Sequence, residues 1–399
     1  MSSLYQHVEM APNDPILGLN EQFNADNRTN KVNLGIGVYS DDNGRLPLLK
    51  AVRAAEQQHF DGATPRGYLP IEGLASYNKG AQALLLGQDS PLIAQGRAIT
   101  VESIGGTGAL KLGADFLKKL SPNSTVYISN PSWQNHQAIF EDAGFVVESY
   151  PYYSAESHGF DFEAMKSHLQ SLEAKSILIL HACCHNPTGV DPSLAQWQEL
   201  LEIIKTRQLI PFLDIAYQGF GEGLNEDAKV VRLFAEAGVE ILVSSSFSKS
   251  FSLYGERVGA LTLTTETKEQ AANVLSQVKT VIRTNYSNPP THGATIVATV
   301  LNSPELFNMW EEELSEMRVR IRSMREQLVE SIKAAGVEQD FSFVLTQNGM
   351  FSYSGLTKVQ VDRLREEFGI YAVGSGRICV AALNSNNVDY VAKSIAKVL

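Results

Sequence analysis

Short apolar runs alternate with amphipathic segments through the first two thirds of the chain. Four of these runs, rich in β-branched and other apolar residues, span 125–130, 176–181, 209–215 and 240–246. Each is followed by a turn and then by apolar residues at helical spacing, as in PSLAQWQELLEIIKTRQ after the second run. This alternation predicts an α/β fold with a mostly parallel sheet.

A long amphipathic helix is expected beyond Ser303-Pro304, a pair typical of a helix start. Apolar residues then recur at alternating spacings of three and four, at Trp310, Leu314, Met317, Ile321, Met324 and Leu328. This spacing predicts one buried stripe along the helix. The remaining pattern predicts a smaller α+β domain, completed by part of the N-terminal segment. Its expected parts are FSFVLT, GMFSYSG, a helix around VDRLREEFG, a strand pair formed by IYAV and RICVAAL, and a final amphipathic helix.

The composition narrows the class of protein. A chain of 399 residues is long enough for two domains, and it has no apolar run of the roughly 18 to 20 residues that cross a bilayer. A net charge of -11 argues against nucleic-acid and anionic-membrane partners. The N-terminal segment lacks the basic start and apolar core of a secretory signal, so we expect a cytoplasmic protein.

Polar and aromatic residues are predicted to gather at one edge of the sheet. Trp133, Asn186, Asp214 and Lys249 all follow the ends of expected strands, where ligands bind in parallel sheets. Lys249 stands among serines in SSSFSKSFSLYGERVGA, with Arg257 eight residues on. The hydroxyls and the arginine suit an anion, and the lysine is the one group there that could act as a nucleophile after losing its proton.

The glycine run in SIGGTGALKLGADFLKKL is expected to open a helix. Unpaired amides at a helix start, with the hydroxyl of Thr107, suit a phosphate group, although a simple tight turn is the alternative. The GGTG spacing does not match a dinucleotide-binding fingerprint.

The segment HACCHNPTGVDP invites a zinc interpretation. Paired zinc ligands are normally separated by other residues, and adjacent Cys183 and Cys184 are not, so we expect no metal and interpret the cysteines as buried thiols. Asn186 precedes a proline, which restricts it to an extended conformation and would aim its amide at a ligand; a plain turn is the alternative. Asp214 ends an apolar strand, where a carboxylate needs a cationic partner or a structural role.

Taken together and in this order, these segments resemble the class I aspartate and aromatic aminotransferases, the pyridoxal-phosphate enzymes of fold type I. The resemblance runs from DPILGLNEQF and KVNLGIGVY through GGTGAL, NPSWQNH, CCHNPTGVDP, DIAYQGF, SFSKSFSLYGERVGA and NYSNPP to SGRICVA. It implies a mostly parallel seven-stranded sheet in a large cofactor-binding domain at 46–309. It also implies a small α+β domain from 15–45 and 310–399, and an N-terminal arm at 1–14.

The resemblance assigns the residues around the cofactor, pyridoxal 5'-phosphate. Lys249 would bind it covalently and move a proton, and Asp214, supported by His136, would pair with the ring nitrogen. Tyr217 and Asn186 would hydrogen-bond the phenolic oxygen of the ring. The ring face and the phosphate would be contacted by Trp133, Gly106, Thr107, Ser246, Arg257 and, across a dimer interface, Tyr68.

Substrate binding also follows from the resemblance. Arg377 would hold the substrate α-carboxylate, assisted by Gly37, Asn186 and Trp133. Arg283 would cross the dimer interface to bind a side-chain carboxylate, so the resemblance implies a homodimer with a composite active site. For either arginine considered alone, a surface salt bridge is the default interpretation.

The resemblance is stronger to the aromatic branch of the family. Aspartate-preferring members commonly carry Lys, Thr and Asn where this chain has Ser40, Leu46 and Gly67, whereas Val38, Thr107 and Asn288 agree with the aspartate branch. We therefore expect an enzyme that moves the amino group of tyrosine, phenylalanine, tryptophan and aspartate to 2-oxoglutarate by a ping-pong mechanism. The alternative is an aspartate aminotransferase with weak aromatic activity.

Two other function classes are alternatives to amino transfer. A regulator that uses this fold as a sensor would need a DNA-binding module, for which the chain has neither the length nor a basic patch. An elimination or decarboxylation enzyme on the same cofactor is compatible with the fold alone. Two carboxylate-binding arginines favour amino transfer, because they bind both ends of a keto-acid acceptor.

Overall fold

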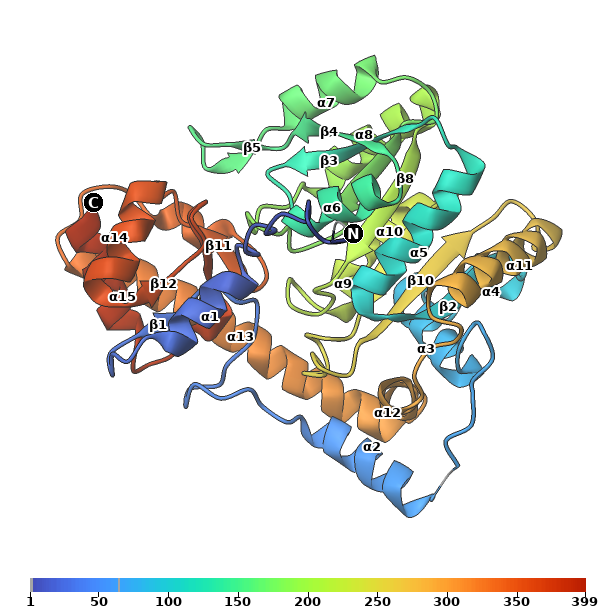
Figure 1. The fold of residues 1–399 in the computed structure, drawn as a ribbon, viewed down its shortest axis with the longest axis horizontal. Helices are drawn as coiled ribbons and strands as arrows, with labels where there is room; N and C mark the ends of the chain where they lie inside the picture. The colour runs from blue at the N-terminus through green and yellow to red at the C-terminus, as the bar shows by residue number, and fades with distance from the viewer. Residues whose placement is uncertain (1–2, 64) are drawn as a thin grey trace.

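The computed structural model describes residues 3–63 and 65–399, and a seven-stranded sheet forms its centre (Figure 1). In spatial order the strands are β2 (Ala98–Ile104), β10 (Val258–Thr264), β9 (Leu242–Ser246), β8 (Ile210–Ile215), β7 (Ile177–His181), β3 (Thr125–Asn130) and β4 (Val146–Pro151). Strand β10 runs antiparallel to both neighbours, and the other neighbouring pairs are parallel. The predicted α/β class and mostly parallel seven-stranded sheet are confirmed.

Strand β7 is apolar in four consecutive residues and fully buried, as is typical of a strand with helices on both faces of its sheet. In β7, Ile177 and Ile179 pack into one hydrophobic cluster, and Leu178 and Leu180 pack into another on the opposite face. The covering helices and their connections include α3 (Ala75–Leu86), α4 (Pro91–Ala94), α5 (Gly105–Leu120), α6 (Gln134–Asp142), α7 (Phe162–Ser171), α8 (Leu194–Arg207), α9 (Leu224–Asp227), α10 (Lys229–Glu236) and α11 (Lys268–Asn285). A short hairpin of β5 (Tyr153–Ser154) and β6 (Gly159–Phe160) lies beside them.

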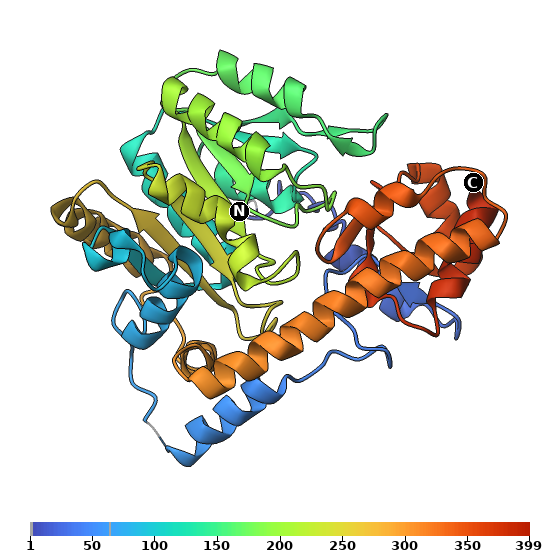
Figure 2. The same cartoon turned by 180° about the vertical axis from the view of Figure 1, so that it is seen from behind.

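Helix α13 (Pro304–Ala334) is the long helix predicted from the sequence. The hydroxyl of Ser303 accepts a hydrogen bond from the amide of Leu306, which caps the helix start. All six residues of the predicted stripe are buried. The first four join the core beneath the large sheet and the last two join a separate cluster, so α13 runs through both parts of the molecule (Figure 2).

The separate cluster lies around the second half of α13. It is built from α13, α14 (Lys358–Phe368), α15 (Val388–Val398), the short helices η1 (Ser342–Thr346) and η2 (Val380–Ala382), and the strands β1 (Val32–Asn33), β12 (Ile370–Tyr371) and β13 (Arg377–Cys379). Strand β11 (Phe351–Tyr353) lies next to β13, but its Phe351 joins the larger core. The predicted pairing of IYAV with RICVAAL is wrong. Strand β12 instead pairs with β1, and β13 pairs with β11. Both partners lie farther away in sequence than the predicted one. The run FSFVLT contains a short 3-10 helix.

The N-terminal part of the chain lies along both regions. Residues 3–15 are exposed and contain no helix or strand, and α1 (Leu17–Ala25) follows them; the first two residues of the predicted arm lie outside the described residues. Helix α2 (Lys50–Asp61) packs against α13 and α12 (His292–Leu301). Among the described residues no helix is long and apolar enough to cross a membrane.

Candidate active site

A cavity of about 320 Å³ lies at the carboxyl ends of the parallel strands, where β8 and β9 end and α5 begins. Most residues predicted for the site line it: Gly37, Gly106, Thr107, Trp133, Asn186, Asp214, Tyr217, Ser246, Lys249, Arg257 and Arg377. These residues come from segments as distant as 37 and 377, and the tertiary structure brings them together. The other three predicted residues do not line the cavity. His136 lies buried behind Asp214, whereas Tyr68 and Arg283 are exposed on the surface of this chain.

Lys249 lies in the turn after β9 and faces aromatic and charged neighbours. Its Nζ atom lies 4.9 Å from the ring centroid of Tyr217. Burial lowers the pKa of the Lys249 amine to about 8, against the opposing effect of the Asp214 carboxylate. The positive charges of Arg257 and Arg377 contribute to this lowering. A lysine with this pKa is partly neutral near pH 8 and can act as a nucleophile.

Asp214 ends β8, and His136 of α6 supports it. The Oδ2 atom of Asp214 lies 2.9 Å from Nε2 of His136, and the hydroxyl of Ser132 lies 3.0 Å from Nδ1 of the same ring. Burial alone would raise the pKa of Asp214, but His136 and nearby charges lower it below its ordinary value. The aspartate is therefore a buried anion that faces the cavity and suits a cationic ring nitrogen.

The start of α5 forms an anion cradle with Arg257. Gly105 has a φ of +67°, and its amide donates to the carbonyl of Arg257 at 2.9 Å. A side chain at position 105 would place Cβ 2.5 Å from Nη2 of Arg257, so glycine permits this close approach. Helix α5 has no side-chain cap, so the first-turn amides that follow Gly105 can bind an anion beside Ser246 and Arg257.

Arg377 is a buried cation with two neutral hydrogen-bond partners among the described residues. Its Nη1 donates to Oδ1 of Asn186 at 3.1 Å, and its Nη2 donates to the carbonyl of Gly35 at 2.5 Å. The guanidinium carbon lies 4.2 Å from the ring centroid of Phe351. The Nε atom is buried and has no hydrogen-bond partner among the described residues. Arg377 lines the cavity, and a substrate carboxylate is a ligand of suitable charge for its guanidinium group.

Several residues that line the cavity were not predicted from the sequence. The aromatic residues are Phe351 and Tyr254, the apolar ones are Ile16, Ile36, Val38, Leu110 and Ala216, and the polar ones are His181 and Ser248. Phe351 lies close to Gly37, where a Cβ would come within 2.7 Å of the Phe351 ring. The signal available for Phe351 was its place in the short strand GMFSYSG, but strand character alone does not show which face meets a cavity. Leu46, expected near the pocket, is 47% exposed and does not line it in this chain.

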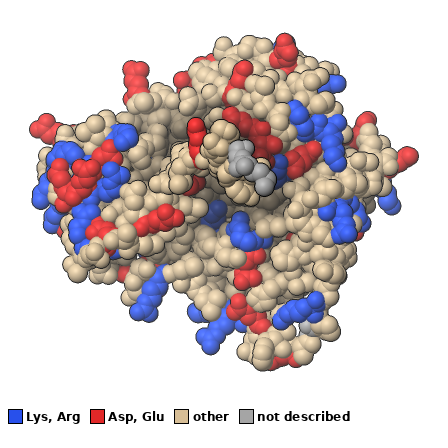
Figure 3. Space-filling view, in the orientation of Figure 1, with Lys and Arg blue, Asp and Glu red and all other residues tan. Residues whose placement is uncertain are grey.

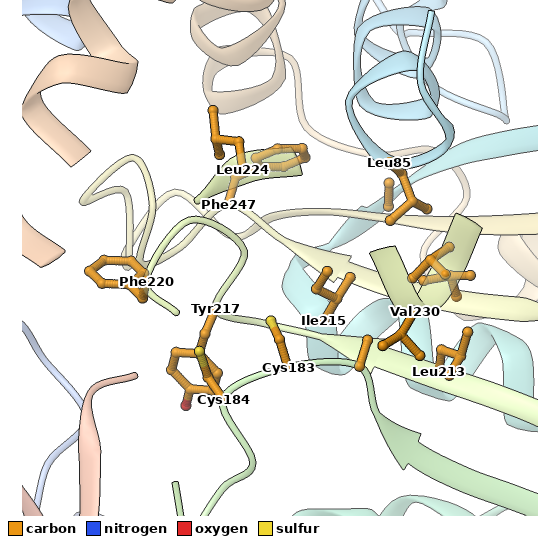
Figure 4. Close-up of a cluster of buried hydrophobic side chains, with 14 of the residues drawn as sticks. Leu85, Cys183, Cys184, Leu213, Ile215, Tyr217, Phe220, Leu224, Val230 and Phe247 are labelled. Atoms are coloured by element: carbon orange, nitrogen blue, oxygen red, sulfur yellow. The ribbon is translucent and has the colours of Figure 1, made fainter. Parts of the chain in front are cut away.

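Tyr217, which lines the cavity, belongs to the same core cluster as the two adjacent cysteines. Figure 4 shows Leu213 and Ile215 of β8 leading toward Tyr217, with Cys183 and Cys184 in the same cluster. The cysteines are free and buried, and their sulfur atoms lie near the Asp227 carboxylate. That carboxylate already accepts the amides of Gly219, Gly221 and Glu222. The absence of a bound metal stays a prediction.

Acidic and basic side chains are interspersed over the face seen in Figure 3. The visible surface therefore carries charges of both signs beside one another.

Comparison with known proteins gives a consistent family. Residues 29–395 match the model of the family described as aminotransferase class I and II. The chain is 62% identical to an aspartate aminotransferase of Pseudomonas aeruginosa, over the full length of both. It is 63% identical, with a TM-score of 0.98 and full coverage of both chains, to the structure of an aromatic-amino-acid aminotransferase from Burkholderia pseudomallei covalently bound to pyridoxal phosphate. A psychrophilic aromatic amino acid aminotransferase from Psychrobacter sp. B6, cocrystallised with aspartic acid, is 46% identical over 99% of both chains, with a TM-score of 0.97.

The geometry of the cavity fits the cofactor of this family. The α5 cradle suits a phosphate, Asp214 suits a protonated ring nitrogen, and Lys249 offers an amine of lowered pKa. The fold, these side chains and the matches over almost the whole chain agree. The chain belongs to the aminotransferase class I and II family and is an aminotransferase that depends on pyridoxal phosphate.

Proposed function

We propose that this aminotransferase moves the amino group of aromatic amino acids, and of aspartate, to 2-oxoglutarate. The observation that carries the aromatic part is the apolar lining of the cavity. Ile16, Ile36 and Val38 line it together with the cationic Arg377. A cation next to apolar side chains suits a substrate with a carboxylate at one end and a ring at the other.

The chain's residues would share the work at the cofactor ring. Pyridoxal phosphate, when bound, supplies a ring that accepts the electron pair left at the substrate α-carbon after a proton departs. Lys249 would bind the cofactor, then take and return that proton. Asp214 would keep the ring nitrogen protonated through its carboxylate, which His136 holds in place. The hydroxyl of Tyr217 and the amide of Asn186, 3.5 Å apart, would donate to the phenolic oxygen.

The remaining cofactor contacts would fix position. Trp133 would stack on the ring face, since it lines the cavity beside Asp214 and Asn186. The phosphate would lie at the start of α5, with contacts from Gly106, Thr107, Ser246 and Arg257. A held phosphate leaves the ring in one orientation, which aligns the substrate with Lys249.

A second copy of the chain would complete the site. Tyr68 is 95% exposed, and Arg283, whose Nη1 donates to Ser287, is also exposed. We propose that these side chains cross a homodimer interface, Tyr68 to the phosphate and Arg283 to a side-chain carboxylate. Arg377, with Gly37, Trp133 and Asn186 beside it, would bind the α-carboxylate of each substrate.

Dual specificity raises a physical problem at Arg283. A ring against an unpaired buried cation is unfavourable, so Arg283 must leave the pocket when an aromatic substrate binds. Similarity to the aspartate aminotransferase of Pseudomonas aeruginosa favours the alternative, an aspartate aminotransferase with weak aromatic activity.

Single-turnover kinetics would decide between these substrates. The purified enzyme with bound cofactor is mixed with aspartate, glutamate, tyrosine, phenylalanine or tryptophan, and the loss of the aldehyde-form absorbance is followed. We expect aromatic rates at least comparable to the aspartate rate. Aspartate rates larger by orders of magnitude would establish the alternative.

Three broader assignments belong to the same proposal. We propose that the enzyme works in the cytoplasm, which agrees with its three free cysteines. We also propose that residues 15–45 and 310–399 form a small domain and residues 46–309 a large one, with an arm at 1–14. The separate hydrophobic cluster around the end of α13 supports this division, although the first half of α13 packs with the larger core.

A further inference from the structure

Arg325 is a buried arginine of α13 that lies outside the active-site cavity. Its side chain is part of a residue only 2% exposed. Nη2 donates to the carbonyls of Gly349 and Phe351, both at 2.7 Å. Nη1 donates to the hydroxyl of Ser352 and, at 3.4 Å, to the carbonyl of Val344. One guanidinium group thus holds four acceptors within a nine-residue segment, 344–352.

These four acceptors are neutral, so the charge of the Arg325 guanidinium group is buried without a counter-charge among them, which costs free energy. Burying a guanidinium group requires that its donors be satisfied, and backbone carbonyls satisfy the donors without neutralising the charge. An apolar side chain could fill the same space in a core of this kind. What the arginine adds is geometry, because its planar donor group fixes several carbonyls relative to one another.

The segment held by Arg325 ends in Phe351, whose ring contacts Arg377. Phe351 pairs with Cys379 and Tyr353 pairs with Arg377, so β11 and β13 place the ring against the guanidinium group, 4.2 Å from its centroid to Cζ. The Phe351 ring also lies close to Gly37. A shift of the Phe351 backbone would therefore move the ring that packs against the Arg377 guanidinium group.

Other arginines of α13 hold a different segment in a similar way. Arg318 donates to the carbonyl of Gly219 at 2.7 Å, and Arg322 donates to the carbonyl of Gly221 at 2.9 Å. These carbonyls belong to the loop after Tyr217. Arg322 therefore offers a comparison on the same helix, since it also donates to a backbone carbonyl but does not hold Phe351. It differs from Arg325 in being more exposed and paired with Glu222.

We propose that Arg325 is a positioning residue for substrate carboxylate binding: it fixes the backbone of Phe351, and the Phe351 ring fixes Arg377. The inference rests on the proposed role of Arg377 as the α-carboxylate site. It assigns to Arg325 an effect on substrate affinity rather than on the chemical step.

The test measures ligand affinity and turnover separately in the holoenzyme. Maleate, a dicarboxylate without an amino group, is added stepwise while the cofactor absorbance is followed, which gives a Kd. Steady-state kinetics with glutamate and a 2-oxo acid as substrates give KM and kcat. The variants are Arg325→Gln, Arg325→Lys and the control Arg322→Gln. Loss of well-placed charge contacts is expected to raise the maleate Kd and the glutamate KM of Arg325→Gln about 10-fold or more, with kcat changed less than about 3-fold.

The other variants sharpen the result. Arg325→Lys keeps the charge but not the planar donor group, so its affinity loss should lie between wild type and Arg325→Gln. Arg322→Gln should keep both constants close to wild type. If Arg325→Gln does not fold, Phe351→Leu should reproduce the affinity loss, because it removes the ring beneath Arg377.

Two results would overturn the inference. One is an unchanged maleate Kd in Arg325→Gln, or in Phe351→Leu where it takes its place. The other is an equal loss in Arg322→Gln, which would indicate a general effect of α13. Failure of the proposed function is seen separately, as a wild-type holoenzyme that does not transfer amino groups from any of the proposed donors.

Discussion

The Nε2 atom of His136 lies 2.9 Å from the Oδ2 atom of Asp214, and both side chains are buried at the end of β8. The pair joins the start of α6 to the central sheet. It holds a carboxylate in its charged form at the place where the cofactor ring nitrogen is proposed to lie. The strength of this contact can be tested through catalysis.

Replacing His136 should weaken the enzyme without abolishing it. A hydrogen bond to a charged group contributes about 1.5–3 kcal/mol, so His136→Ala should lower kcat/KM for glutamate by about 10- to 100-fold. Asp214→Asn should cause a larger loss, because it removes the charge itself. Steady-state kinetics of both variants give the comparison. Wild-type activity in His136→Ala would show that Asp214 needs no such support.

Cofactor capture should depend on pH through Lys249. The pKa of this amine is lowered to about 8, so the neutral, nucleophilic form grows as pH rises toward 8 and is nearly complete above 9. Apoenzyme mixed with pyridoxal phosphate should therefore bind it faster as pH rises from about 6.5 to 8.5, with a plateau above that range. Stopped-flow absorbance measures the rate. A rate that keeps rising toward pH 10.5 would show an unperturbed lysine.

The matching control is Lys249→Ala. This variant should bind pyridoxal phosphate without a covalent link, and borohydride should not trap the cofactor on the chain. Trapping that persists in the variant, detected by mass spectrometry, would place the covalent link on another residue.

The close approach of Gly105 to Arg257 should make position 105 critical for cofactor affinity. Gly105→Ala adds a Cβ that would lie 2.5 Å from Nη2 of Arg257, at a residue with φ of +67°. We expect the Kd of the apoenzyme for pyridoxal phosphate to rise about 10-fold or more, since a displaced arginine loses charge-assisted contacts to the phosphate. Fluorescence titration of the apoenzyme measures this Kd.

Gly238→Ala separates backbone strain from the contact with Arg257. Gly238 has a similar φ of +74°, but its added Cβ would meet open space. Both variants should lose about 1–2 kcal/mol of stability from the left-handed conformation. Only Gly105→Ala should lose cofactor affinity, and an equal affinity loss in Gly238→Ala would mean that global destabilisation causes the effect.

The two substrate arginines should differ in selectivity. Arg377→Lys should lower kcat/KM for every amino donor, because the planar fork that fits a carboxylate is lost in all cases. Arg283→Leu should lower kcat/KM for aspartate by about 100-fold or more, the effect of removing one partner of a charge pair worth 2–5 kcal/mol. Its effect on phenylalanine should be small. Equal losses for aspartate and phenylalanine would mean that Arg283 has a structural role.

Local patterns predicted much of the fold. The runs that form β3, β7, β8 and β9 were found from β-rich apolar segments, and the alternating spacing of three and four gave the buried stripe of α13. Strands β2, β4 and β10 were not identified, and the pairing in the small sheets was predicted incorrectly. Strand pairing is a long-range choice, so neighbours in sequence such as IYAV and RICVAAL need not be neighbours in the sheet.

By itself, the sequence of this protein determined the chemical identities of the site residues, since Lys249, Asp214, Asn186 and Arg257 stand in short segments with recognisable order and local conformation. The tertiary structure decided which distant groups meet them. Phe351 lies against Arg377 because β11 pairs with β13, and Arg325 reaches Phe351 because α13 crosses both regions. Side-chain spacing along a chain specifies which face of an element is buried, but the partners across that face depend on how the whole chain packs.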